Sequence, residues 1–123
     1  MVLSLTHKKS LKDDLFRKRK PQDDFVFDEE VADVFDDMVV RSIPGYETIV
    51  STIGGFAKKY YRADSNIYDL GCSLGGVTFE ICKQLRERDF NLIAIDNSEA
   101  MIERLVERKA RVGGLENLSL IHI

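Results

Sequence analysis

The stretch NIYDLGCSLGG, residues 66–76, decides how this chain folds. Its first half is a short, mostly apolar run that predicts a buried strand, and its second half is a glycine-rich turn. The residues after the turn recur at helical spacing, so the turn opens a helix: Val77, Ile81, Cys82 and Leu85. Gly71, Gly75 and Gly76 allow positive φ and a close approach of the backbone to a ligand, and the new helix offers unpaired N–H groups to an electronegative one. The stretch therefore predicts a binding site for a small molecule.

Two helices are predicted before this strand. Glu29 and Glu30 suit the first turn of a helix that Asp28 can cap. One apolar face follows: Val31, Val34, Phe35, Met38 and Val39. Residues 42–45, SIPG, end this helix, and a second helical face runs from Tyr46 to about Tyr60. The domain thus begins with a helical extension ahead of its first strand.

A second strand, a helix and a third strand follow. Residues 91–96, NLIAID, are short and nearly all apolar, as a parallel strand covered on both faces should be. Ser98 suits the N-cap of a helix that Gly113 and Gly114 end, and residues 118–123 predict the third strand. The order helix, helix, β, α, β, α, β predicts an α/β fold with a parallel sheet and helices on both faces. This is one half of a doubly wound, Rossmann-like fold, which usually has two halves.

An incomplete Rossmann-like sheet leaves one edge of the strand at 66–70 bare. A bare apolar edge invites pairing with another chain. We therefore expect this chain to be part of a longer protein, or to associate into a dimer.

Composition and charge indicate a globular protein with reduced thiols. Of its 123 residues, 44% are apolar and 32% charged, and no apolar run suits a membrane span or a signal peptide. Cys72 and Cys82 make neither a metal-type pair nor a disulfide framework, so we expect no metal and a cytoplasmic location. Residues 1–20 hold seven basic and two acidic residues, a net charge of +5 within a total of −3. We interpret residues 1–24 as a basic, disordered arm, since no aromatic motif accompanies the charges to indicate nucleic-acid binding.

Three kinds of site fit the glycine-rich turn. A dinucleotide site prefers Gly-x-Gly-x-x-Gly, and this turn has Ser73 in place of the middle glycine. Residues 71–75 also match Gly-x-Ser-x-Gly, the nucleophile elbow of hydrolases, but the only later histidine is His122. An adenosyl cofactor fits better, because Asp96 at the end of the second strand can accept both ribose hydroxyls while Asp69 faces a cationic end of the ligand. Each carboxylate alone could equally well cap a helix or a turn.

These residues resemble a known family. Residues 69–73 and 95–98, DLGCS and IDNS, look like the class I S-adenosylmethionine-dependent methyltransferase fold. The narrower resemblance is to the carboxy-S-adenosyl-L-methionine synthases of bacterial tRNA wobble-uridine modification. It covers about residues 25–123 and includes RSIPGY at 41–46 and GCSLG at 71–75. The resemblance implies that residues 25–123 are the N-terminal half of a domain that binds S-adenosyl-L-methionine.

The resemblance implies an enzyme that converts S-adenosylmethionine and prephenate to carboxy-S-adenosylmethionine and phenylpyruvate. A carboxyl group released from prephenate as carbon dioxide would be captured by the methyl carbon of the cofactor. The positions that match cofactor contacts of the family are Tyr46, Gly71, Cys72, Ser73, Asp96 and Asn97. The argument from strand ends adds Asp69. The family's residues for prephenate fall beyond Ile123, so the catalytic residues are unknown.

We expect a cytoplasmic homodimer with prephenate as its small-molecule substrate, no membrane partner and no direct nucleic-acid binding. One alternative is an ordinary S-adenosylmethionine-dependent methyltransferase acting on a small molecule or RNA. Another is a non-catalytic binding or dimerisation module. We expect this chain by itself to bind cofactor without catalysing a reaction.

Overall fold

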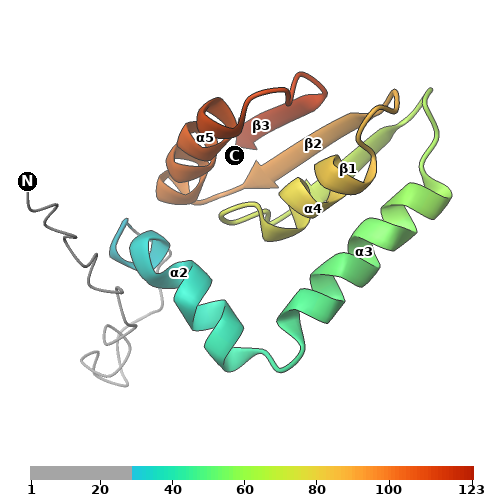
Figure 1. The fold of residues 1–123 in the computed structure, drawn as a ribbon. Helices are drawn as coiled ribbons and strands as arrows, with labels where there is room; N and C mark the ends of the chain where they lie inside the picture. The colour runs from blue at the N-terminus through green and yellow to red at the C-terminus, as the bar shows by residue number, and fades with distance from the viewer. Residues whose placement is uncertain (1–28) are drawn as a thin grey trace, which may run out of the picture.

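The computed structural model describes residues 29–123. The basic arm predicted at 1–24 and the cap predicted at Asp28 lie outside these residues. The elements are α2 (Glu29–Ser42), α3 (Tyr46–Tyr60), β1 (Asn66–Leu70), α4 (Gly76–Gln84), β2 (Asn91–Asp96), α5 (Glu99–Val112) and β3 (Leu118–His122). Figure 1 shows α2 and α3 meeting at a bend beside a small sheet, with α4 and α5 packed against that sheet. Each element lies where the sequence predicts it.

The strands form one parallel sheet in the order β1-β2-β3. Asp69 of β1 lies beside Ala94 of β2, and Asp96 of β2 lies beside His122 of β3. Parallel strands that are joined by helices make up the predicted βαβαβ arrangement, and the α/β fold class is confirmed. Because the strands are parallel, Asp69 and Asp96 come to the same end of the sheet.

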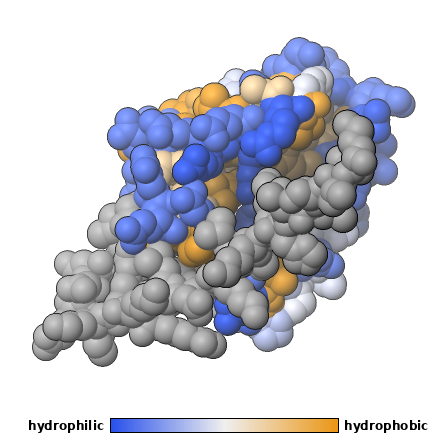
Figure 2. All heavy atoms as spheres, turned by 60° about the vertical axis from the view of Figure 1, so that its left-hand side comes forward, coloured by the Kyte–Doolittle hydropathy of each residue, from blue (hydrophilic) through white to orange (hydrophobic). Residues whose placement is uncertain are grey.

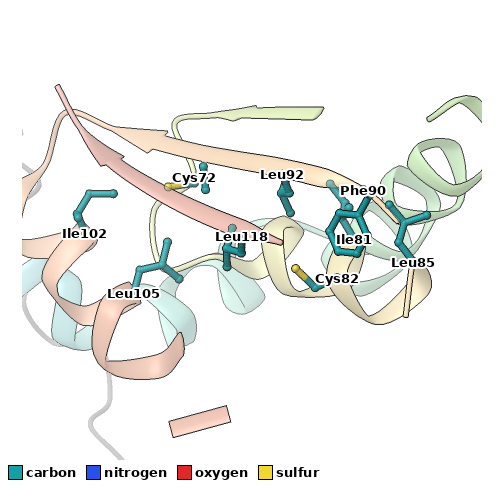
Figure 3. Close-up of a cluster of buried hydrophobic side chains, with 10 residues drawn as sticks. Cys72, Ile81, Cys82, Leu85, Phe90, Leu92, Ile102, Leu105 and Leu118 are labelled. Carbon is teal, nitrogen blue, oxygen red and sulfur yellow. The ribbon is translucent and has the colours of Figure 1, made fainter. Parts of the chain in front are cut away.

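The main core lies between the sheet and helices α4 and α5. Its buried residues are Cys72, Ile81, Cys82, Leu85, Phe90, Leu92, Ala94, Ile102, Leu105 and Leu118. Figure 3 shows the labelled side chains filling the layer between the strands above and the helices below. A large apolar side chain that is fully buried contributes roughly 1.5–3 kcal/mol, so this layer is the main source of stability.

The other face of the sheet is open in the described part of the chain. Tyr68, Leu70 and Ile121 on this face are 56%, 75% and 41% exposed. The sequence predicts helices on both faces, because the strands are apolar on both. That detail differs in the structure, where α4 and α5 both pack on the face that carries Leu92 and Ala94. The sequence pattern shows that a face is apolar but not which element covers it.

Helix α3 packs against α4 through a glycine. A Cβ on Gly54 would lie 2.7 Å from the Gln84 side chain and 2.9 Å from that of Glu80. The Gln84 amide also donates to the Ser51 carbonyl at 3.0 Å. This contact fastens the helical extension to the helix that follows the glycine-rich turn. Within residues 29–123 no helix is long and apolar enough to cross a membrane.

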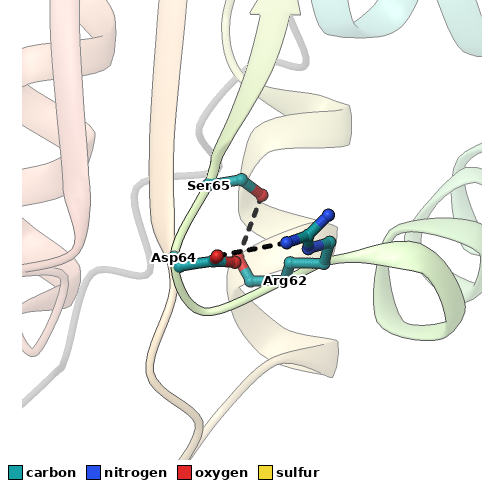
Figure 4. Close-up of polar contacts among 3 residues, drawn as sticks. All are labelled: Arg62, Asp64 and Ser65. Atoms are coloured by element: carbon teal, nitrogen blue, oxygen red, sulfur yellow. Dashed lines mark hydrogen bonds and ion pairs between the residues drawn. The ribbon is translucent and has the colours of Figure 1, made fainter.

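A polar turn leads from α3 into β1 (Figure 4). Arg62 and Asp64 form an ion pair at 3.1 Å, and the Ser65 hydroxyl donates to the Arg62 carbonyl at 3.1 Å. These groups are exposed, so the ion pair adds less than about 1 kcal/mol to stability. The role of the turn is to direct the chain into β1.

Candidate functional site

The glycine-rich turn after β1 is held against the neighbouring strand. The backbone N–H groups of Gly71 and Cys72 both donate to the Ile95 carbonyl of β2, at 2.8 and 3.0 Å. Gly71 and Gly75 have φ values of 74° and 84°, a region that glycine enters without strain. Ser73 lies in the same region at 51°, which is uncommon for a residue with a side chain. These hydrogen bonds hold the turn in place beside the carboxyl end of β2.

Asp96 joins the tip of β2 to this turn. Its two carboxylate oxygens accept the backbone N–H groups of Ser73 and Ser98, each at 2.8 Å. The residue is buried, with 8% of its surface exposed. Ser98 caps α5 as predicted, since its hydroxyl oxygen accepts the Met101 N–H at 3.3 Å. Asp96 thus has the structural role that the sequence left open, and each of its oxygens has the capacity to accept one more hydrogen bond.

Asp69 is the second carboxylate at this end of the sheet. It accepts a hydrogen bond of 2.5 Å from the hydroxyl of Thr78, in the first turn of α4. Burial raises the pKa of Asp69, the hydrogen bonds from Thr78 lower it, and the charge of Asp96 raises it. The two carboxylates therefore interact and make this end of the sheet electronegative. Sequence analysis does not single out Thr78, although a hydroxyl in the first helical turn after a carboxylate at a strand end signals such a bond.

The Tyr46 hydroxyl lies over the start of α4. A Cβ on Gly76 would come within 2.5 Å of the hydroxyl oxygen, so Gly76 gives room to Tyr46. Burial raises the pKa of Tyr46, and the charges of Asp36 and Asp69 raise it further. The hydroxyl is therefore a neutral hydrogen-bond donor near these carboxylates. Helices α3 and α4 and strand β1 thus bring Tyr46, Gly76 and Asp69 together.

Cys72 contributes its side chain to the core and not to this site (Figure 3). Burial raises the pKa of its thiol to about 12, with the charges of Asp69 and Asp96 adding to the effect. The thiol is therefore protonated and a poor nucleophile. The Cys72 carbonyl accepts the Gly75 N–H at 2.9 Å. Cys72 therefore stabilises the turn through its buried side chain and its backbone carbonyl.

Asn97 is exposed immediately after Asp96. Its carbonyl oxygen lies 3.2 Å from Nε2 of His122. A hydrolase would need His122 to accept the proton of Ser73, and within residues 29–123 no hydrogen bond joins these two side chains. The structure therefore disfavours the nucleophile-elbow alternative.

Helix α2 packs against the turn, a contact that the sequence does not predict. Val31 and Ala32 of α2, Leu74 of the turn and Met101 of α5 form a second buried cluster. Figure 2 turns this side of the molecule forward and shows hydrophilic residues over much of the coloured surface, with hydrophobic residues visible between them. The cluster anchors Leu74 of the turn to α2 and α5.

Arg108 of α5 makes polar contacts with both the glycine-rich turn and α2. Its guanidinium donates to the Leu74 carbonyl at 3.1 Å and pairs with Asp36 of α2. A second ion pair, Arg104 to Asp33 at 2.8 Å, also joins α5 to α2. Because the partners of Arg108 are 34 and 72 residues away, no local sequence signal predicts these contacts. The helical extension is therefore attached directly to the candidate site.

The start of α4 adds hydrogen-bond donors to the site. Within residues 29–123 the backbone N–H groups of Gly76 and Val77 have no acceptor. Such donors suit a ligand carboxylate, the nearby Asp69 suits a cationic group, and Asp96 suits vicinal hydroxyls. No group of three or more His, Cys, Asp or Glu side chains in the described part could hold a metal.

The chain is similar to bacterial proteins named carboxy-S-adenosyl-L-methionine synthase. It is 48% identical over 95 residues to that of Pseudoalteromonas translucida (strain TAC 125), and 56% identical over 84 residues to that of Shewanella sediminis (strain HAW-EB3). The matches cover 77% and 68% of this chain but 39% and 35% of the relatives, so the chain spans less than half of their length. No protein-family model matches it. The resemblance expected from the sequence is confirmed over the matched residues.

Solved structures with this fold include methyltransferases. A Methanococcus maripaludis protein named as a candidate S-adenosyl-L-methionine-dependent methyltransferase has a TM-score of 0.62 at 16% identity, over 85% of this chain and 46% of its own. The plantazolicin methyltransferase BamL, solved in complex with a triazolic desmethylPZN analog and SAH, has a TM-score of 0.51 at 21% identity, over 76% of this chain and 33% of its own. These likenesses show the class I methyltransferase fold.

Proposed function

We propose, on the premise of this similarity to carboxy-S-adenosyl-L-methionine synthases, that the chain binds S-adenosyl-L-methionine across the carboxyl ends of β1 and β2. The observation that carries the proposal is the placement of Asp69 and Asp96 at the tips of adjacent parallel strands. The glycine-rich turn lies between them, bonded to Asp96 through Ser73. Ligands of open α/β sheets bind in the crevice at this end of the strands.

Asp96 would hold the ribose. Its oxygens retain acceptor capacity beyond the two backbone bonds that they receive, and vicinal hydroxyls need two acceptors close together. Asn97, exposed beside it, would contact the adenosyl part of the ligand. Gly71 and Ser73 would line the nucleoside with their backbone, while Cys72 would keep the shape of the turn from the core side.

Asp69 and Tyr46 would face the amino-acid end of the ligand. The ammonium and sulfonium groups there are cationic, and Asp69, Asp96 and Asp36 make the surroundings electronegative. The backbone N–H groups of Gly76 and Val77, which have no acceptor within residues 29–123, would receive the ligand carboxylate. The bound cofactor would supply a methyl group activated by its sulfonium.

The full-length relatives suggest the complete activity. We propose that a protein containing this domain converts S-adenosylmethionine and prephenate to carboxy-S-adenosylmethionine and phenylpyruvate, for the modification of tRNA wobble uridines. We also propose a cytoplasmic homodimer. The exposed apolar residues Tyr68, Leu70 and Ile121 on the open face of the sheet support self-association. No described residue is assigned to prephenate.

Isothermal titration of the chain with S-adenosylmethionine tests cofactor binding. We expect saturable binding that Asp96→Ala weakens and Asp64→Ala, an exposed carboxylate far from the strand tips, leaves unchanged. Absence of binding by the folded chain would overturn the cofactor proposal.

Mass spectrometry of the full-length protein after incubation with S-adenosylmethionine and prephenate tests the reaction. A carboxylated cofactor supports the synthase. Methyl transfer to a small molecule or RNA would instead indicate an ordinary methyltransferase, and binding without any product would indicate a non-catalytic module.

A further inference from the structure

A cavity lies at the opposite end of the sheet from the proposed cofactor site. Its volume is about 590 Å³, and Phe79 with residues in the stretches 82–90 and 112–118 line it. Pockets for small molecules usually have volumes of roughly 300–1,000 Å³. β2 runs from Asn91 to Asp96 between the two places, so at about 3.3 Å per residue they are on the order of 15–20 Å apart. The cavity is therefore separate from the cofactor site.

The floor of this cavity is apolar. Phe90 and Leu118, beside the starts of β2 and β3, are buried, and Cys82 of α4 lies in the same layer (Figure 3). Burial raises the pKa of the Cys82 thiol to about 11, with the nearby Lys109 lowering it, so the thiol is neutral near pH 7. A ligand on this floor would present an apolar group.

The rim of the cavity is positively charged. Lys83, Arg86 and Arg88 stand around it against a single acidic residue, Glu87. All four are exposed, at the end of α4 and in the turn that follows. A ligand that reaches from the floor to this rim would meet an excess of cations.

Arg86 is the cation most available to a ligand. Lys83 pairs with Glu80 at 3.5 Å, and the guanidinium of Arg88 lies 5.7 Å from the ring centroid of Tyr61. Arg86 makes no ion pair within residues 29–123. A guanidinium that has no ion-pair partner in the described part of the chain, next to an apolar cavity, suits a bidentate carboxylate.

We propose that this cavity is a second binding site, for a small carboxylate with an aromatic or branched apolar body. The apolar body would rest on the floor of Phe90, Leu118 and Cys82, and the carboxylate would pair with Arg86 at the rim. This inference does not depend on the proposed function, because no residue is shared between the two sites.

Amide NMR of the full chain with 1-naphthylacetate tests this site. We expect saturable shifts confined to residues 79–90 and 112–118, with a Kd on the order of 1 mM or below. The matched amine, 2-(1-naphthyl)ethylamine, and the matched alcohol, 2-(1-naphthyl)ethanol, should bind at least about tenfold more weakly, which corresponds to 1.4 kcal/mol. S-adenosylmethionine added to the same sample should leave these residues unshifted.

Charge reversal at the rim provides the second measurement. Arg86→Glu should raise the Kd for 1-naphthylacetate by at least about tenfold. Arg41→Glu makes the same charge change on the exposed surface of α2 and should leave the Kd unchanged, although loss of the ion pair with Asp37 lowers the melting temperature slightly. Equal binding of amine and carboxylate, shifts outside the cavity, absence of binding, or an unchanged Kd in Arg86→Glu would each overturn the proposal. Any of these results could arise while S-adenosylmethionine still binds, so the two proposals fail independently.

Discussion

The carboxylate of Asp96 lies 2.8 Å from the backbone nitrogen of Ser73, a bond that joins the tip of β2 to the turn after β1. Removing this carboxylate should therefore disturb the turn and the ligand together. We expect Asp96→Ala to weaken S-adenosylmethionine binding by roughly 1–3 kcal/mol in isothermal titration. Asp96→Asn keeps one acceptor oxygen, so its affinity for S-adenosylmethionine should lie between those of the wild-type chain and Asp96→Ala. Unchanged affinity in Asp96→Ala would contradict the assigned role.

Asp69 should make stability depend on pH. Burial raises its pKa in the folded chain above the ordinary value of 3.8. A carboxyl group that binds its proton more tightly when folded stabilises the fold fully below pH 3.8, and this stabilisation is lost as the pH rises through the raised pKa. In urea unfolding at pH 3.5–7, the wild-type chain should lose stability relative to Asp69→Asn as the pH rises. A constant difference between the two chains would show that Asp69 does not titrate in this way.

Arg108 should control how firmly α2 holds the turn. It donates to the Leu74 carbonyl and pairs with Asp36. We expect Arg108→Ala to remove about 0.5–1.5 kcal/mol of local stability, seen as faster amide exchange at Leu74 and in α2, and to weaken cofactor binding severalfold. Arg111→Ala, on an exposed residue of the same helix, is the matched control. Exchange rates that change equally in both variants would point to a general effect on α5.

Gly75 should be intolerant of any side chain. Its φ is 84°, and a Cβ there would lie 2.5 Å from Cδ1 of Leu105. Gly45 has nearly the same backbone conformation, with φ 72° and ψ 22° against 84° and 25° for Gly75, but nothing lies within 4 Å of a Cβ built on it. Gly45→Ala should therefore destabilise by about 1–2 kcal/mol from backbone strain alone. Gly75→Ala should destabilise by a further 1–3 kcal/mol or so from the clash, measured by urea unfolding.

Both cysteines should resist alkylation in the folded chain. Burial raises the thiol pKa of Cys72 to about 12 and that of Cys82 to about 11. Little thiolate is then present at pH 8, and both residues are buried. Iodoacetamide followed by mass spectrometry should label neither residue without urea and both in urea. Rapid labelling of Cys72 alone would show that the turn opens.

The elements and the positions of the strand-tip carboxylates could be predicted from local sequence. Spacing of three and four residues marks the helices, and Ser98 and Gly113 mark the limits of α5. Asp69 and Asp96 come together because parallel strands bring their carboxyl ends to one edge.

The partners of these residues could not be predicted in the same way. Arg108 meets Leu74 and Asp36 only after the chain has folded, and many other pairings of charges fit the sequence equally well. The apolar pattern of the strands also does not predict which face of the sheet the helices cover. Tyr68 and Leu70 are apolar like the residues of the covered face, yet they remain exposed in the described chain.

That uncovered face should make the thermal stability of the chain depend on its concentration. Apolar groups that gain contacts only when two folded molecules meet link folding to association. The melting temperature should therefore rise with the amount of protein in the sample, and Leu70→Lys should abolish that rise while leaving the dilute chain folded. Samples at several dilutions, melted side by side, would reveal it.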